Sequence, residues 1–384
     1  MTSGYPIERL TVSILSAPVD SAVPMSFGTL TDRRVCLVEV EAGGVVGIGE
    51  SWLNYPGWSH AERLSTFTEG IAPLVFGLDA SDPAGVLALL CGRLLPVGRQ
   101  AGAIGPIWQA LSGIDIALWD IAGKLAGKPV HELLTGTASR SSVPAYASGI
   151  GPSDIESLCA VALADGYRAI KTKIGFGAER DRATLSAARD CVGAGIELFA
   201  DANQAWDVAA ATEQINALAD YDVRWIEEPL AGDRVEDLQK LAAAVPLPIA
   251  TGENVYGTED FESRTGSGAV TLIQPDLAKS GGFTIARAVA ESANRFDVRI
   301  APHCYSSGIG IAASAQFGAA YDRVDWVEMD VRPNPLRTEL LARGPELSDG
   351  AIHLPTSPGL GVELDPATVR RFRIHREERT RNAH

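Results

Sequence analysis

Cysteine is scarce in this chain, and the few cysteines are not arranged in pairs. Cys36, Cys91, Cys159, Cys191 and Cys304 stand far apart, with no Cys-x-x-Cys spacing. A disulfide-stapled secreted domain and a zinc site built on cysteine pairs both need closely spaced cysteines. The sequence therefore argues against both classes and predicts reduced cysteines in a cytoplasmic protein.

Long uncharged apolar runs and an excess of positive charge are also missing. The most apolar long stretch, residues 104–127, carries Asp115 and Asp120, which favours a buried helix over a membrane span. No basic segment followed by an apolar one stands at the start, so no signal peptide is expected. The net charge of −15 argues against nucleic acid or an anionic membrane as a partner. Local cations must therefore attract an anionic substrate.

The sequence has an ordinary globular composition and enough length for two structural units. Its 384 residues, 46% hydrophobic and 21% charged, are more than one compact core usually holds. Residues 7–50 alternate apolar and polar, with Gly43-Gly44 at the expected turn of an antiparallel hairpin. Apolar residues at steps of three and four between Ile107 and Leu125 predict a buried helix. We expect residues 1–130 to form an α+β unit.

A strand-and-helix repeat begins near residue 142. A period of about 25 residues per unit is typical of a parallel (β/α) barrel, in which the C-terminal ends of the strands share one mouth. We expect the barrel to occupy residues 131–330 and residues 331–384 to form an irregular returning segment. The predicted strands are 142–149, 169–175, 197–203, 224–230, 248–254, 271–276, 298–303 and 325–329.

Three of these predicted strands end in carboxylates at equal spacing. Asp201, Glu227 and Glu253 are 26 residues apart both times. Three acids at one mouth would repel each other, and a hard divalent cation would neutralise them. Because carboxylate oxygens suit Mg²⁺, the spacing favours a magnesium site over three solvated strand-end acids.

Lys171 and Lys173 lie two residues apart on the strand before Asp201, so their side chains point the same way. At roughly 4 Å and an effective dielectric constant near 20, their repulsion costs about 4 kcal/mol, or about three pK units. We therefore predict a lowered lysine pKa, which suits a general base. The alternative is a pair of surface lysines on an exposed strand.

Further polar residues end the later strands. Asp276 ends one strand and His303 the next, which is a common arrangement of a histidine base with the acid that orients it. Taken alone, His303 would more often be a core histidine. Glu328 ends the eighth predicted strand, where a protonated carboxyl could donate a hydrogen bond to an oxyanion. Glu228 has the opposite parity to Glu227, and we therefore leave it out of the ligand set.

These residues together predict removal of a proton next to a carboxylate. A metal that binds the substrate carboxylate lowers the cost of a second negative charge while a base removes the α-proton. The resulting enediolate can then be protonated on the same carbon, or it can lose a leaving group from the β-carbon.

The chain resembles the enolase superfamily, and within it the mandelate racemase subgroup. The resemblance covers nearly the whole chain and includes Gly113-Ile114-Asp115, Lys171-Thr172-Lys173, Asp201-Ala202-Asn203, Trp225-Ile226-Glu227-Glu228-Pro229, Gly252-Glu253-Asn254, Pro275-Asp276, His303 and Glu328. It implies a modified TIM barrel, (β/α)₇β, with an α+β capping domain formed by the N-terminal part and the C-terminal segment.

The resemblance also implies roles for the residues of the mouth. Lys173 would be one base and the His303–Asp276 pair the other, with Lys171 near the substrate carboxylate and Glu328 as electrophilic donor. A lysine in place of Asp276 would have indicated the muconate-lactonising branch. The implied Mg²⁺ ligands are Asp201, Glu227 and Glu253.

Two segments of the first unit, residues 24–32 and 50–59, are expected to close over the mouth and contact the substrate. Trp52 and Tyr55 are bulky, and Ser26 and Asn54 offer partners for hydroxyl or carboxylate groups. Asn203 is the further substrate contact expected from the barrel.

We therefore expect a Mg²⁺-dependent enzyme that acts on a small hydroxy-carboxylate. Dehydration of an acid sugar is favoured because most of the resembling subgroup acts in this way, and racemisation or epimerisation is the alternative. A binding protein without catalysis is the remote alternative. A homo-oligomer is expected.

Overall fold

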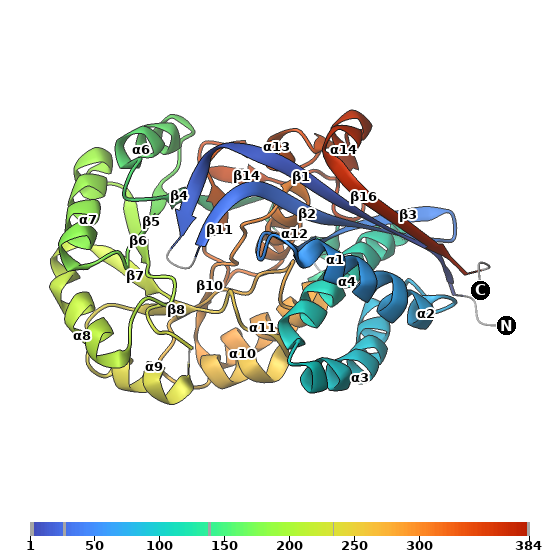
Figure 1. Ribbon diagram of the computed structural model, residues 1–384, viewed down its shortest axis with the longest axis horizontal. Coiled ribbons are helices and arrows are strands. Elements are labelled where there is room, and N and C mark those ends of the chain that lie inside the picture. The colour runs from blue at the N-terminus through green and yellow to red at the C-terminus, as the bar shows by residue number, and fades with distance from the viewer. Residues whose placement is uncertain (1–3, 26–27, 137–139, 233, 382–384) are drawn as a thin grey trace.

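The computed structural model describes residues 4–25, 28–136, 140–232 and 234–381. Figure 1 shows a long antiparallel sheet with helices beside a ring of strands surrounded by further helices. The antiparallel sheet has the order β16-β1-β2-β3. Its strands are β1 (Ile7–Met25), β2 (Gly28–Ala42), β3 (Val45–Trp52) and β16 (Arg373–Thr380).

The hairpin predicted for residues 7–50 is confirmed, with Gly43 and Gly44 at positive φ in the β2–β3 turn. The expected loop at 24–32 is wrong in its extent, because β1 continues to Met25 and β2 already begins at Gly28. The alternation of apolar and polar residues does not show where β1 ends and β2 begins. Ser26, an expected substrate contact, lies outside the described residues.

Helix α4 is the buried helix that the apolar stripe predicts. It packs on β3 so closely that a Cβ at Gly49 would overlap the carbonyl of Gly113. None of the helices in the described part of the chain has the length and apolar character needed to cross a bilayer. The helical segments of this part are α1 (Ser59–Ser65), η1 (Thr66–Ile71), α2 (Ala72–Val75), α3 (Pro83–Ala101), α4 (Ile104–Ala126) and α5 (Val130–Thr135).

The second part is a (β/α)₇β barrel, as predicted. Neighbouring strands β4 to β10 are parallel, β11 pairs in parallel with β4, and the backbone of Ile300 bonds to residues 323 and 325 ahead of β11, which closes the ring. Its elements are β4 (Ser142–Ile150), α6 (Ile155–Ala164), β5 (Ala169–Lys173), α7 (Ala178–Val192), β6 (Glu197–Asp201), α8 (Val208–Ala217), η2 (Ala219–Tyr221), β7 (Val223–Glu227), α9 (Val235–Ala242), β8 (Ile249–Thr251), α10 (Gly257–Thr265), β9 (Leu272–Ile273), α11 (Gly282–Phe296), β10 (Arg299–Ile300), α12 (Gly308–Ala320) and β11 (Val327–Asp330).

The remaining segment returns to both parts of the molecule. Strand β14 pairs antiparallel with the start of β4, and β16 adds an edge strand beside β1. The limits of the units at residues 130 and 330 stay a prediction. The elements of this segment are α13 (Pro335–Thr338), β12 (Leu341–Arg343), β13 (Glu346–Ser348), β14 (Ala351–His353), β15 (Glu363–Leu364), α14 (Pro366–Phe372) and β16.

Two buried carboxylates join the first part to the barrel. Asp115 of α4 accepts hydrogen bonds from the backbone and hydroxyl of Thr284 in α11. Glu50 of β3 accepts from the backbone N–H groups of Ser307 and Gly310, at 3.1 and 2.9 Å. Burial raises the pKa of Asp115 to about 7 and that of Glu50 to about 6, although these hydrogen bonds lower both. Each carboxylate thus fixes a barrel element against the cap.

Candidate active site

Strand register brings the predicted charged residues to one end of the barrel. Lys173 of β5 is the partner of Asp201 in β6, and Asp201 is the partner of Glu227 in β7. Glu253 stands two residues beyond the end of β8. The equal spacing in sequence therefore corresponds to neighbouring strand ends, as expected for parallel strands of similar length.

The two lysines are surrounded by carboxylates. Lys173 Nζ lies 2.5 Å from Asp201 Oδ2 and 2.7 Å from Asn203 Oδ1. Lys171 Nζ lies 2.7 and 2.8 Å from the carboxylate oxygens of Glu227, and 3.0 Å from Glu328. Lys171 is buried beneath the mouth, at 2% exposure, and its place near a substrate carboxylate stays a prediction.

The predicted lowering of the lysine pKa is wrong when only the charged groups of the protein itself are considered. Burial and Lys171 lower the pKa of Lys173, but Asp201, Glu253 and Glu227 together raise it above its ordinary value. The pKa of Lys171 is likewise raised, because Glu227 and Glu328 outweigh its burial. The prediction considered repulsion between the two lysines and left out the acids on the next strands.

His303 lies between two carboxylates. Its Nδ1 is 2.7 Å from Asp276 Oδ2, and its Nε2 is 3.0 Å from Glu253 Oε2. Burial lowers the pKa of His303, but Glu253, Glu328 and the hydrogen bond to Asp276 raise it well above its ordinary value. Burial raises the pKa of Glu253, but His303 lowers it well below its usual range. The structure thus brings His303 and Asp276 together and leaves Nε2 directed towards the acids.

Glu328 also lies in this group, but in a charged form. Its Oε2 accepts from the backbone N–H of Cys304 at 3.1 Å. Burial raises the pKa of this carboxyl, but Lys171 and His303 lower it to about 2. The expectation of a protonated Glu328 is therefore wrong for these surroundings, because two cations lie beside it.

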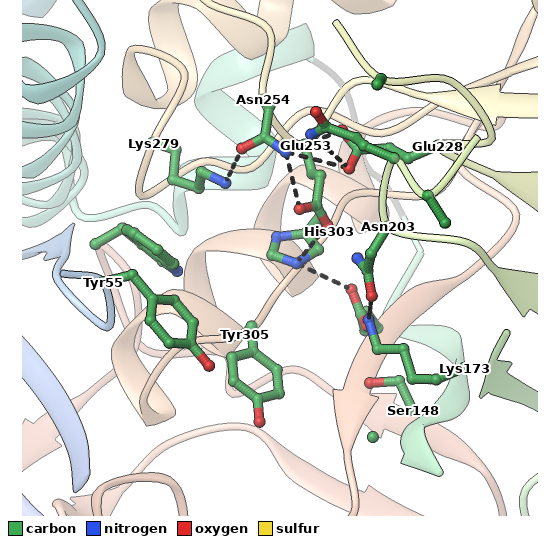
Figure 2. A pocket seen from close by; sticks show the side chains of 16 residues that line it. Tyr55, Ser148, Lys173, Asn203, Glu228, Glu253, Asn254, Lys279, His303 and Tyr305 are labelled. Atoms are coloured by element: carbon green, nitrogen blue, oxygen red, sulfur yellow. Dashed lines mark hydrogen bonds and ion pairs between the residues drawn. The ribbon is translucent and has the colours of Figure 1, made fainter. Parts of the chain in front are cut away.

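A cavity of about 640 Å³ opens over these residues. Figure 2 shows Lys173 and His303 facing it, with Tyr55 and Tyr305 near each other at the lower left of the view. Asp201, Glu227, Asp276 and Lys171 lie beneath the cavity and are at most 2% exposed. The predicted site residues that line it are Trp52, Tyr55, Lys173, Asn203, Glu253, His303 and Glu328.

The cap contributes fewer contacts than expected. Asn54 does not line the cavity, because its amide donates to the backbone oxygen of Tyr305 and accepts from the backbone of Arg34. Trp58, which lies within the capping segment expected at residues 50–59, is 76% exposed and points to solvent. Leu30 packs with Tyr55 and Tyr305, so the hairpin of β1 and β2 reaches the barrel mouth.

Two charged residues of the cavity were not predicted. Glu228 lines it because its positive φ of 40° ends the strand alternation from which we excluded it. Burial and the nearby Glu253 raise the pKa of Glu228 to about 8. Lys279 lines the cavity from the loop after β9. Its position three residues after Asp276 was the available signal, but a lysine in a loop has no periodic pattern to identify it.

The donor set fits a divalent cation in its chemistry. Six carboxyl groups gather here with three lysines and one histidine, so two negative charges are in excess when all ten groups are ionised. In the described residues no three acidic, histidine or cysteine side chains surround one point, since the ammonium groups of the two β5 lysines bind Asp201 and Glu227. Oxygen ligands on neighbouring strands with this charge suit Mg²⁺. The acids are Asp201, Glu227, Glu228, Glu253, Asp276 and Glu328.

Comparison with known proteins identifies the class. Residues 9–135 match the mandelate racemase / muconate lactonizing enzyme N-terminal domain, and residues 154–368 match the domain described as enolase C-terminal domain-like. The chain belongs to the mandelate racemase/muconate lactonizing enzyme family of the enolase superfamily. It is an enzyme of that superfamily, as predicted.

Relatives of known activity differ in the reaction they catalyse. D-galactarolactone cycloisomerase of Agrobacterium fabrum is 35% identical over 94% of this chain and 96% of its own. L-talarate/galactarate dehydratase of Salmonella typhimurium is 31% identical over 94% and 90% of the two chains. Both act on acid-sugar compounds, one as a cycloisomerase and one as a dehydratase.

Solved structures share the whole architecture. A mandelate racemase/muconate lactonizing enzyme from Bordetella bronchiseptica superimposes with a TM-score of 0.86 at 36% identity, over 96% of this chain and 99% of that one. A variant of an L-talarate/galactarate dehydratase has a TM-score of 0.85 at 28% identity, over 98% and 94%. That second structure contains Mg and L-glucarate.

Proposed function

We propose that this enzyme removes the α-proton of an acid sugar and eliminates the substituent on the β-carbon, with Mg²⁺ held by Asp201, Glu227 and Glu253. The observation that carries the proposal is the placement of Lys173 and His303 at one cavity with these acids beside them. When bound, Mg²⁺ supplies positive charge that stabilises the negative charge developing on the substrate carboxylate.

The protein residues then move two protons. One of Lys173 Nζ and His303 Nε2 accepts the α-proton, and the other delivers a proton to the leaving oxygen on the β-carbon. Asp276 holds Nδ1 of His303 at 2.7 Å, which leaves Nε2 as the reacting nitrogen. When the leaving group is a hydroxyl, the products are water and an enol that becomes a 2-keto-3-deoxy acid.

Two other outcomes use the same residues. In a lactone the leaving oxygen belongs to the ring, and elimination opens it, a reaction favoured by the 35% identity to a D-galactarolactone cycloisomerase. In racemisation or epimerisation the second base returns a proton to the α-carbon itself. Dehydration and ring opening are preferred here because the activities named for both curated relatives start from acid-sugar compounds.

A panel of acid sugars, their lactones and 2-hydroxy acids tests the proposal with Mg²⁺ present. Ketone formation and α-proton exchange in D₂O are read in the same samples, so that elimination and racemisation are distinguished. Ketone should form from an acid sugar or its lactone, and chelation by EDTA should abolish it. Glu227→Gln should retain the fold, by circular dichroism, and lose turnover by about 10² or more. Full turnover after EDTA would contradict the proposal.

A further inference from the structure

Lys279 is a buried ammonium group in the same cavity, and among the described residues it forms no ion pair with a carboxylate. The side chain is 3% exposed. Its Nζ donates to Asn254 Oδ1 at 2.9 Å and lies 4.7 Å from the centre of the Trp52 ring. The lysines of β5 differ, because each lies within 3 Å of a carboxylate oxygen. Burial lowers the pKa of Lys279, but Glu253, Asp276 and Glu228 raise it above its ordinary value. Nearby acids thus stabilise the ammonium, but none of those described is hydrogen-bonded to it.

Lys279 lines the cavity, and its ammonium has capacity for a further hydrogen bond there. An ammonium has three N–H donors, and the amide of Asn254 and the face of the Trp52 ring account for two directions. A buried charge is compensated best by a hydrogen-bonded group of opposite charge. A carboxylate on the ligand would supply this group.

Lys279 lies at the other end of the cavity from the first base. In Figure 2, Lys279 and Lys173 lie on opposite sides of His303. The backbone N–H of Trp52 donates to the oxygen of Ala278 at 3.0 Å, so β3 fixes the indole beside the Lys279 loop. The indole Nε1 of Trp52 has no hydrogen-bond partner among the described residues and is a second donor at this end.

We propose that Lys279 binds the second carboxylate of a dicarboxylic acid sugar, whose first carboxylate and α-carbon lie by Lys173 and His303. This inference rests on the proposed function and narrows its substrate class. A monocarboxylic acid sugar places a neutral hydroxymethyl group at Lys279, and a lactone places a neutral ester there. Both leave the ammonium without a hydrogen-bonded carboxylate.

The test compares a six-carbon aldaric acid with the aldonic acid of the same hydroxyl configuration and with the aldaric lactone. The wild type should have its highest kcat/KM for the aldaric acid. Lys279→Met and Lys279→Gln should each lower that value about 10- to 100-fold, as expected for a lost hydrogen bond between charged groups, and change the value for the aldonic acid much less. Lys279→Arg, which keeps the charge, should retain most of the preference.

Lys240→Met is the matched control, because this lysine of α9 is 66% exposed and lies outside the cavity. Its kcat/KM values should equal those of the wild type. A preference of the wild type for the aldonic acid or the lactone would overturn the inference, as would equal losses for both acids in Lys279→Met and Lys279→Gln.

Failure of the proposed function is recognised separately. If the wild type turns over no acid sugar, calorimetric binding of the aldaric and aldonic acids with Mg²⁺ present decides the role of Lys279. Tighter binding of the aldaric acid that Lys279→Gln removes would support the inference. Equal binding of both acids by the wild type would overturn it.

Discussion

Lys173 and His303 approach the cavity from strands that are well separated around the ring. Lys173 ends β5, the second barrel strand, and His303 follows β10, the seventh. We predict that each base alone exchanges the α-proton of one configuration at the α-carbon. In His303→Asn, net turnover should fall about 10²–10⁴-fold. Lys173 should still exchange the α-proton of the configuration that it faces. Proton NMR in D₂O measures this exchange, and Lys173→Ala should show the opposite preference.

The stereochemistry of exchange provides the control in this comparison. If both single variants exchanged the same configuration at similar rates, the two residues could not serve opposite faces. One of them would then be assigned to substrate binding or to structure.

At the level of single residues, the sequence predicted positions better than charge states. Alternation and strand ends correctly placed Lys173, Glu253 and His303 at the mouth. The protonation of Glu328 and the pKa of Lys173 were predicted wrongly, since both depend on charged neighbours that are distant in sequence. Glu228 was missed because a local backbone turn, which no alternation rule includes, directs it into the cavity.

Helix α4 joins the barrel helix α11 through one buried carboxylate, and this contact predicts a pH dependence of stability. Burial raises the pKa of Asp115 from 3.8 to about 7, so the folded protein holds a proton that the unfolded chain releases between these values. The contribution of Asp115 to the free energy of unfolding is therefore fully present below pH 4 and is lost as the pH rises through 7. Each pK unit corresponds to about 1.4 kcal/mol, so the loss is up to about 4 kcal/mol.

Asp115→Asn removes this titration. The stability of the variant minus that of the wild type should therefore be larger at pH 8 than at pH 5. The lost hydrogen bonds to Thr284 add a constant to this difference and do not change its dependence on pH. Thermal unfolding midpoints at the two pH values measure the difference. Asp260→Asn, at an exposed position of α10, should show no such change with pH. An Asp115→Asn difference that is the same at both pH values would refute the prediction.

At the level of elements, the periodic patterns predicted where strands and helices lie better than they predicted which strands pair. The eight barrel strands and the helix of residues 104–126 were predicted because each has its own regular apolar pattern. The pairing of β16 with β1 was not predicted, because it joins residues more than 350 positions apart. The charged sequence of β16, part of the segment expected to be irregular, forms an edge strand. An edge strand tolerates such residues, since its side chains are largely exposed.

The charge of the whole molecule predicts how salt affects catalysis. A net charge of −15 repels an anionic substrate over long distances, while the cations of the cavity act only nearby. Raising ionic strength shortens the screening length from about 30 Å at 0.01 M to about 8 Å at 0.15 M. With the Mg²⁺ concentration fixed, kcat/KM for an acid sugar should therefore rise severalfold with added salt.

A dicarboxylic substrate should show a steeper rise than a monocarboxylic one, because the repulsion grows with substrate charge. Initial rates at low substrate concentration measure both slopes. A fall of kcat/KM with salt would mean that the field at the mouth attracts anions, against the net charge.

The pairing of β16 with β1 has a consequence for the order in which the protein is made. Strand β1 leaves the ribosome long before its edge partner Arg373–Thr380, because the whole barrel lies between them in the sequence. Until then the outer edge of β1 presents unpaired backbone groups, which invite contacts with other nascent chains. The sheet over the active site is thus completed only after all the barrel strands have been made. An interrupted translation product would contain every catalytic residue proposed here but would lack the strand that protects this edge.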